Sequence, residues 1–137
     1  MAPKEGKYQN ERNENLDEYF KAVGVPYLLR KMILTSRPTL EVIKQDEDNK
    51  WTIKTISLLR TAELSFTLGE EFIENMPTGL TIKNVAKIED DSIVISSLGP
   101  NGEKTERKYE FKEDEVIFSM THEQSGQVAK RYFKKIP

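Results

Sequence analysis

The sequence predicts a mainly β protein: an antiparallel up-and-down β-barrel of about ten strands, with two helices between its first two strands. Three observations predict this fold. A single helical region lies near the N-terminus, and only short runs of alternating residues follow it. Segments of turn-forming composition separate these runs. Hydrophobic residues make up only 36% of the chain, which is low for a folded domain and suggests that some inward positions are polar.

Length and composition narrow the class of protein. A chain of 137 residues fits one domain over residues 1–137, with a core large enough to fold without disulfide bonds or a structural metal. It has no cysteine, which excludes a disulfide framework and thiolate metal sites. The net charge of −2, with Lys and Arg spread along the chain, argues against a nucleic-acid-binding protein. No apolar run resembles a signal peptide or a membrane span, so we expect a soluble cytoplasmic protein.

Two helices are expected after a short first strand at residues 6–10. Apolar residues recur at the spacing of one helix face, namely at Leu16, Tyr19, Phe20 and Val23. Asn13 or Asn15 is the expected cap of this helix, and Gly24 ends it. Pro26 suits the first turn of a second helix, PYLLRKMILTS, which Pro38 closes.

From residue 39 onward the periodicity changes to two. Alternation predicts strands over residues 39–45, 50–57, 62–68, 71–76, 80–88, 92–98, 103–111, 115–122 and 127–135. The connecting segments DEDN, EDD, GPNGE, KED and EQSG have turn compositions. Regular short strands with tight turns indicate an up-and-down barrel or a sandwich.

The last strand, VAKRYFKKIP, places a charged residue on its inner face. Neighbouring side chains of a strand point to opposite faces, and Lys130 and Lys134 share the face that needs water. Arg131 should therefore share the interior with Ala129 and Phe133. An unpaired buried ion is costly, so Arg131 needs an anionic partner.

Other strands also carry polar residues on the face expected to be inward. In EKTERKYEF, Arg107 and Tyr109 share a face with Phe111, and in KWTIKTIS, Thr55 shares a face with Trp51. A sandwich core would leave these groups without partners. A barrel of about ten strands is too wide for side chains to fill and holds a ligand and water instead. We therefore favour the barrel.

Three segments resemble the intracellular lipid-binding protein family, the cytosolic fatty-acid and retinoid carriers. GKYQNERNENLDEYFKAVGVPYLLRK resembles the family's N-terminal signature, LSFTLGEEF resembles its Ile-Ser-Phe-x-Leu-Gly-x-Glu-Phe segment, and RYF resembles its closing Arg-x-Tyr. The resemblance extends from Gly6 to Lys135. The chain departs from the family pattern at Asn10, Leu16 and Phe133. The resemblance implies a ten-stranded β-clam with a helix-turn-helix lid between its first two strands, and without catalysis, metal or cofactor.

The resemblance also implies a binding site for a ligand carboxylate. Family members commonly hold this group with two arginines and a tyrosine on the last strands. Arg131 matches the terminal arginine, Tyr109 matches the other arginine, and Phe133 matches the tyrosine. We therefore expect Arg131 and Tyr109 to bind the carboxylate, with Arg107 as a second cation. The alternative for Arg107 is an ion pair with Glu71 or another inward acid.

The lid and the turns beneath it are expected to line the entrance to the cavity. The expected residues of the cavity and portal are Phe133, Leu16, Tyr19, Phe20, Leu28, Ile33, Pro38, Leu59, Leu80, Phe118 and Met120. Lys21, Arg30 and Lys31 form a basic cluster on the lid, which matches a cluster that some relatives use for nuclear entry. Transient membrane contact through this lid is a further expectation. His122, the single histidine, has no catalytic partner at a meaningful spacing.

We interpret the chain as a monomeric carrier that binds a long-chain fatty acid or similar amphipathic carboxylate for solubilisation and transport. Within this class, the alternative ligands are retinoic acid, a bile acid or another bulky hydrophobic anion. A different alternative is a ligand-delivery module whose loaded lid docks on a membrane or a nuclear receptor. The sequence contains no acid–base pair or nucleophile that would support a barrel enzyme.

Overall fold

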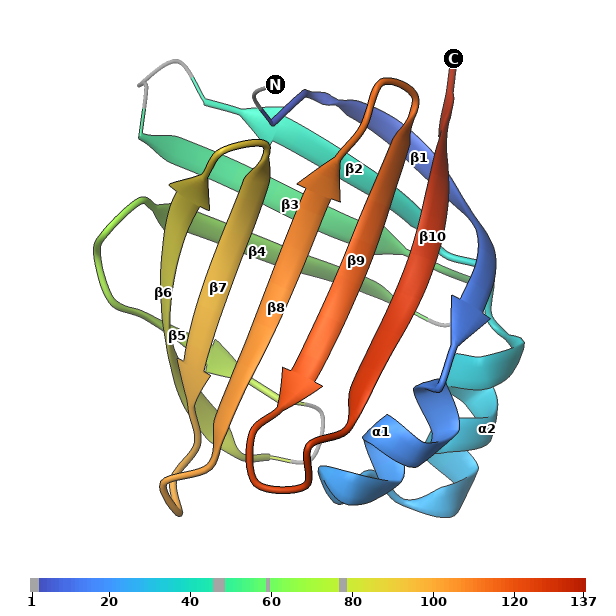
Figure 1. Ribbon diagram of the computed structural model, residues 1–137, viewed down its shortest axis with the longest axis vertical. Helices are drawn as coiled ribbons and strands as arrows, with labels where there is room; N and C mark the ends of the chain where they lie inside the picture. The colour runs from blue at the N-terminus through green and yellow to red at the C-terminus, as the bar shows by residue number, and fades with distance from the viewer. Residues whose placement is uncertain (1–2, 46–48, 59, 77–78) are drawn as a thin grey trace.

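The computed structural model describes residues 3–45, 49–58, 60–76 and 79–137. In this part of the chain two helices lie between the first two of ten strands (Figure 1). The strands are β1 (Gly6–Glu14), β2 (Thr39–Lys44), β3 (Lys50–Ile56), β4 (Thr61–Thr67), β5 (Phe72–Asn75), β6 (Thr81–Glu89), β7 (Ser92–Leu98), β8 (Lys104–Phe111), β9 (Glu115–His122) and β10 (Val128–Ile136). The helices are α1 (Leu16–Ala22) and α2 (Tyr27–Thr35).

All ten strands belong to one antiparallel sheet, in the order β4-β3-β2-β1-β10-β9-β8-β7-β6-β5. The pairing of β1 with β10 joins the two ends of the chain, and the sheet curves so that its halves face each other (Figure 1). The edge strands β4 and β5 are consecutive in the chain. Phe66 of β4 stacks on Phe72 of β5, with ring centroids 5.4 Å apart. The predicted up-and-down barrel is confirmed, and it is nearly closed.

Buried and less buried side chains alternate along β10 in the predicted order. Ala129, Arg131 and Phe133 are buried, whereas Val128 and Lys134 at the outer positions are exposed. Phe133 and Ala129 belong to the two hydrophobic clusters of the interior. The prediction that Arg131 faces inward is therefore confirmed.

Two hydrophobic clusters stabilise the barrel and attach the lid. The larger cluster lies within the barrel and comprises Tyr8, Leu40, Val42, Trp51, Ile53, Phe66, Ala86, Ile93, Ile95, Tyr109, Phe111, Val116 and Phe133. The smaller cluster joins Leu16 and Tyr19 of α1 to Met120 of β9 and Ala129 of β10. Phe118 packs against both clusters. Burial of these apolar side chains therefore docks the lid on β9 and β10.

The start of α1 differs from the expected capped helix. Asn15 occupies the N-cap position, but its φ of 57° is left-handed and its side chain makes no capping hydrogen bond. Asparagine tolerates this backbone region better than most residues. Asn15 Nδ2 instead donates to Gln127 Oε1 at 2.8 Å and to the Val128 carbonyl at 2.9 Å. The Asn15 side chain therefore holds α1 to the start of β10.

The second helix begins after Pro26, as predicted, and packs against α1. Arg30 of α2 donates from Nε to Asp17 Oδ1 at 3.0 Å and from Nη1 to the Val25 carbonyl at 2.9 Å. These contacts hold the helix pair together. Neither helix in the described part of the chain has the length and apolar composition needed to cross a membrane.

Candidate functional site

The inner face of the sheet carries two arginines, Arg131 on β10 and Arg107 on β8. The register aligns Arg131 with Phe118 of β9, and Phe118 in turn with Tyr109 of β8. Neighbouring strands lie about 4.8 Å apart, so the backbones of Arg131 and Tyr109 are separated by about 10 Å. Arg107 lies two residues from Tyr109 on the same face. The three residues therefore start from one part of the inner wall, although the two guanidinium groups contact different strands.

The Arg131 guanidinium is buried among neutral oxygens. The residue is only 7% exposed. Its Nε donates to Asn13 Oδ1 at 3.0 Å, and its Nη2 donates to Asn10 Oδ1 at 3.5 Å and to the Ser36 carbonyl at 3.3 Å. Burial lowers the pKa of Arg131 to about 10, and the positive charge of Arg37 contributes to this lowering.

These contacts satisfy donors of Arg131 without neutralising its charge. None of the ion pairs found among the described residues includes Arg131. A buried cation without a counter-ion is unfavourable because its charge has lost the solvation of water. A planar guanidinium presents paired donors that match a carboxylate. Arg131 is therefore equipped to bind an anion.

Arg107 has a different environment, because it is paired with an acid. Its Nη2 lies 2.6 Å from Glu74 Oε1, and its Nη1 lies 3.3 Å from Glu74 Oε2. The Arg107 and Glu74 side chains are 16% and 18% exposed. The sequence left open whether Arg107 pairs with Glu71 or another inward acid, and in the structure its partner is Glu74. Glu71 is exposed.

Tyr109 lies beside Arg107 in the wall. Its ring stacks on Phe118, with centroids 4.5 Å apart and an angle of 16° between the ring planes. Burial raises the pKa of Tyr109 to about 12, although the charge of Arg107 opposes this shift. The phenol therefore keeps its proton at neutral pH and remains a hydrogen-bond donor.

Most of the apolar residues expected in the cavity and portal are buried or half-buried. Phe133, Leu16, Tyr19, Met120 and Pro38 are buried, and Phe20, Ile33 and Phe118 are half-buried. Leu28 and Leu80 are instead 76% and 51% exposed. Leu59 lies outside the described residues. The apolar wall therefore continues into exposed aliphatic side chains on α2 and on the turn before β6.

The predicted basic cluster on the lid has two exposed members. Lys21 and Lys31 are exposed, and the Lys31 Nζ lies 5.4 Å from the centre of the Tyr27 ring. Arg30 is ion-paired with Asp17, and only 14% of its side chain is exposed. Lys21 and Lys31 are therefore the members available to an external partner.

Sequence reasoning missed the residues that contact the two arginines. Asn10 had been noted only as a departure from an apolar pattern, yet its amide contacts Arg131. Glu74 alternates with Phe72 in EFIENM, and this parity would have placed it on the inner face. The polar residue Asn10 in an otherwise apolar position was the available signal. Asn13 carried no such signal.

Other polar groups offer little chemistry. His122 is buried, and its Nδ1 lies 2.7 Å from Ser125 Oγ. Within the described ranges, no group of three or more His, Cys, Asp or Glu side chains is placed to bind a metal. Trp51 packs in the larger cluster, and its indole N–H is buried without a hydrogen-bond partner.

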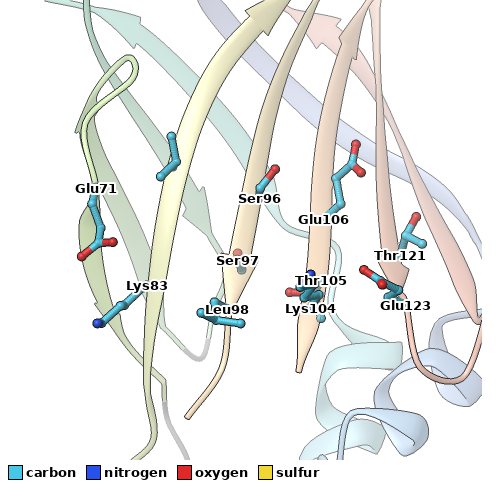
Figure 2. Close-up of a pocket in the computed structure, with 11 residues that line it drawn as sticks. Glu71, Lys83, Ser96, Ser97, Leu98, Lys104, Thr105, Glu106, Thr121 and Glu123 are labelled. Atoms are coloured by element: carbon cyan, nitrogen blue, oxygen red, sulfur yellow. The ribbon is translucent and has the colours of Figure 1, made fainter. Parts of the chain in front are cut away.

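A hollow of about 600 Å³ lies across β6 to β9, and its lining includes neither arginine (Figure 2). Figure 2 shows Lys83 and Glu71 at one side, with Glu106, Thr121 and Glu123 at the other. Charges of both signs alternate over this surface, so it favours neither an anion nor a cation. Because it is open and lacks a buried cation, we do not assign the carboxylate site to it.

Comparison with known proteins identifies the family. The model of the lipocalin / cytosolic fatty-acid binding protein family matches residues 5–114. The chain belongs to this family. The family resemblance inferred from the N-terminal signature and LSFTLGEEF is thereby confirmed, and RYF lies beyond the matched residues.

Individual relatives cover nearly the whole chain. The chain is 32% identical over 136 residues to the fatty acid-binding protein of Tyrophagus putrescentiae, covering 98% of this chain and 99% of that protein. It is 36% identical over 122 residues to cellular retinoic acid-binding protein 2 of Rattus norvegicus, covering 85% and 87% respectively. A crystal structure of a fatty acid-binding protein from brain tissue of Drosophila melanogaster superposes with a TM-score of 0.84 at 31% identity, covering 93% of this chain and 95% of that one.

Proposed function

We propose that this chain is a non-enzymatic intracellular carrier of a long-chain fatty acid or a similar amphipathic carboxylate. The observation that carries the proposal is the buried, uncompensated charge of Arg131. A ligand carboxylate supplies the missing negative charge and replaces the lost solvation. Family membership supports a lipid ligand, because relatives are named as fatty acid-binding proteins.

The apolar wall provides most of the affinity for the tail. Each methylene that leaves water contributes roughly 0.8 kcal/mol, so a long chain binds tightly without any specific contact. Phe118 and Phe133 lie on the same face as Arg131 and are suited to contact carbons near the head group. Reversible burial, rather than any chemical step, is therefore the mechanism.

Tyr109 is the proposed second contact of the carboxylate. It keeps its proton at neutral pH because burial raises its pKa to about 12. A ligand oxygen lying between β8 and β10 accepts from the phenol while the guanidinium neutralises the charge. This arrangement compensates for Phe133, which lacks the hydroxyl expected at its position. Arg107 does not contact the carboxylate in this proposal, since its charge is already matched by Glu74.

Substitution of Arg131 tests this proposal. Arg131→Gln keeps polarity and much of the volume but removes the charge and the forked donors. A charge-assisted contact is worth roughly 1.5–3 kcal/mol, so the affinity for oleate should fall about ten-fold to a hundred-fold. The affinity for oleyl alcohol should change much less, because an alcohol does not use the charge. Isothermal titration calorimetry of both ligands measures the difference.

Arg12→Gln is the matched control. Arg12 is an exposed arginine on β1 that stacks over Tyr132 at 3.6 Å. Its substitution should leave the affinity for both ligands unchanged. Equal losses of acid and alcohol in Arg131→Gln, or no loss of the acid, would reject the proposal.

The ligand class includes bulkier anions as an alternative. The relative from Rattus norvegicus is named for retinoic acid, so retinoic acid is a second candidate, together with bile acids. Arg131 would bind the carboxylate of each candidate in the same way. Mass spectrometry of the lipid that co-purifies under native conditions distinguishes these candidates.

We further propose that the carrier is a cytosolic monomer, which sedimentation and cell fractionation would test.

A second candidate function, ligand delivery, rests on the surface of α2. Tyr27, Leu28 and Met32 are exposed apolar residues, and Lys31 lies among them. Exposed apolar and basic side chains on one helix suit transient binding to an anionic membrane. In this function the lid contacts the membrane while the ligand leaves the barrel.

A further inference from the structure

A largely buried ion pair joins the edge strand β5 to β8, three strands away in the sheet. Glu74 lies on β5, and Arg107 lies on β8, with β6 and β7 between them in the sheet. Both terminal nitrogens of the Arg107 guanidinium donate to the Glu74 carboxylate, Nη2 at 2.6 Å and Nη1 at 3.3 Å. This paired geometry is the one by which arginine binds a free carboxylate.

Neighbouring amide and hydroxyl groups complete the Glu74–Arg107 network. Asn84 Nδ2 donates to Glu74 Oε1 at 3.1 Å, and Asn84 Oδ1 accepts from Arg107 Nη2 at 3.2 Å. Ser97 Oγ donates to the same Asn84 oxygen. Asn84 and Ser97 are buried, and neither is among the described residues that have a buried side-chain polar atom without a partner. The network needs no ligand group to complete it.

The two arginines of the interior therefore differ in charge balance. Arg107 has a carboxylate from its own chain, whereas Arg131 has only amide and carbonyl oxygens. A ligand carboxylate approaching Arg107 would meet the negative charge of Glu74, and it gains less there than at Arg131.

We propose that Glu74 is an internal counter-ion that occupies the carboxylate position at Arg107 and thereby restricts the ligand head group to Arg131. Glu74 is then a specificity-determining residue that sets which way the ligand lies in the barrel. This inference rests on the proposed function, because it takes binding of a ligand carboxylate at Arg131 as given.

The variant Glu74→Gln tests the inference directly. Glutamine keeps the size of the side chain and can still accept a hydrogen bond from Asn84, but Arg107 loses its counter-ion. With oleate labelled with ¹³C at its carboxyl carbon, the wild-type chain should show one bound carboxyl resonance. Glu74→Gln should show a second one, as a second bound equivalent or as a second orientation of one ligand. Native mass spectrometry separates these two cases, and both support the inference.

Matched controls identify the source of the second resonance. Glu71→Gln removes an exposed acid three residues earlier and should retain the single wild-type resonance. The double variant Glu74→Gln, Arg107→Gln removes both charges and should lose the second resonance. A single, unshifted carboxyl resonance in folded Glu74→Gln overturns the inference.

The double variant also tests the inference if Glu74→Gln does not fold. Arg107 is not used by the ligand in our proposal, so the double variant should bind oleate within about threefold of wild type, well below the loss expected for a charged contact. A loss of ten-fold or more for oleate, with oleyl alcohol unaffected, would mean that Arg107 contacts the carboxylate, and would overturn the inference.

Arg131→Gln distinguishes failure of this inference from failure of the proposed function. If Arg131→Gln loses oleate and the double variant also loses it, only the restriction by Glu74 is wrong. If Arg131→Gln retains oleate, the proposed carboxylate site itself is wrong, and the inference falls with it.

Discussion

Asn13 lies directly opposite Arg131 across the β1–β10 ladder and accepts its Nε–H at 3.0 Å. Asn10, near a register shift in β1, approaches the same guanidinium. Both partners are amides, so they orient the guanidinium without cancelling its charge. The barrel therefore holds the proposed binding group in place at a cost in stability, as expected where function requires a buried charge.

The first prediction concerns this cost. Burial lowers the pKa of Arg131 from its ordinary value to about 10, so folding disfavours its charged form. The unfavourable contribution is fully present below about pH 10 and disappears only at higher pH, where the unfolded chain loses the proton as well. Ligand-free Arg131→Gln should therefore be more stable than wild type at pH 7, by roughly 1–3 kcal/mol.

Urea denaturation of delipidated protein measures this difference. The control Arg12→Gln should change the free energy of unfolding by less than about 0.5 kcal/mol, because Arg12 is exposed. A clear loss of stability in Arg131→Gln would contradict this prediction. It would mean that the hydrogen bonds of Arg131 stabilise the fold by more than its buried charge destabilises it.

The second prediction concerns the phenol of Tyr109. Tyr109→Phe keeps the ring that stacks on Phe118 but removes the proposed hydrogen bond to the ligand. A neutral hydrogen bond contributes roughly 0.5–1.5 kcal/mol, so oleate should bind about two-fold to ten-fold more weakly. Fluorescence displacement titration measures the change. Tyr132→Phe is the control, since the Tyr132 hydroxyl donates to Glu14 at an exposed position. Unchanged oleate affinity in Tyr109→Phe would remove Tyr109 from the site.

The third prediction concerns ligand delivery through the lid. If Lys21 and Lys31 drive collision with anionic membranes, transfer of a fluorescent fatty acid should quicken with anionic lipid and slow with added salt. The double variant Lys21→Gln, Lys31→Gln should lose this dependence. The control Lys83→Gln, Lys104→Gln changes two exposed lysines on strands away from the lid and should retain it. Transfer rates that depend on neither vesicle concentration nor salt would indicate release of the ligand into water instead.

The sequence was sufficient for the elements and for the direction in which the last strand presents its side chains. Period-two alternation in VAKRYFKKIP placed Arg131 inward, and the structure agrees. This succeeded because the direction of a side chain along a strand depends only on the local backbone. Asn15 occupies the N-cap position that the sequence predicted, but its side chain does not cap the helix. It bonds instead to Gln127 and Val128, more than a hundred residues away in sequence.

The sequence by itself determined that two arginines enter the barrel, but only the tertiary structure decided which one is neutralised. Arg107 and Arg131 have the same side chain and both face inward. Packing brings Glu74 to Arg107 from the edge strand, while β1 and the end of α2 bring amide and carbonyl oxygens to Arg131. The free energy of a buried charge depends on its neighbours in space, and these come from strands and turns that are distant in sequence.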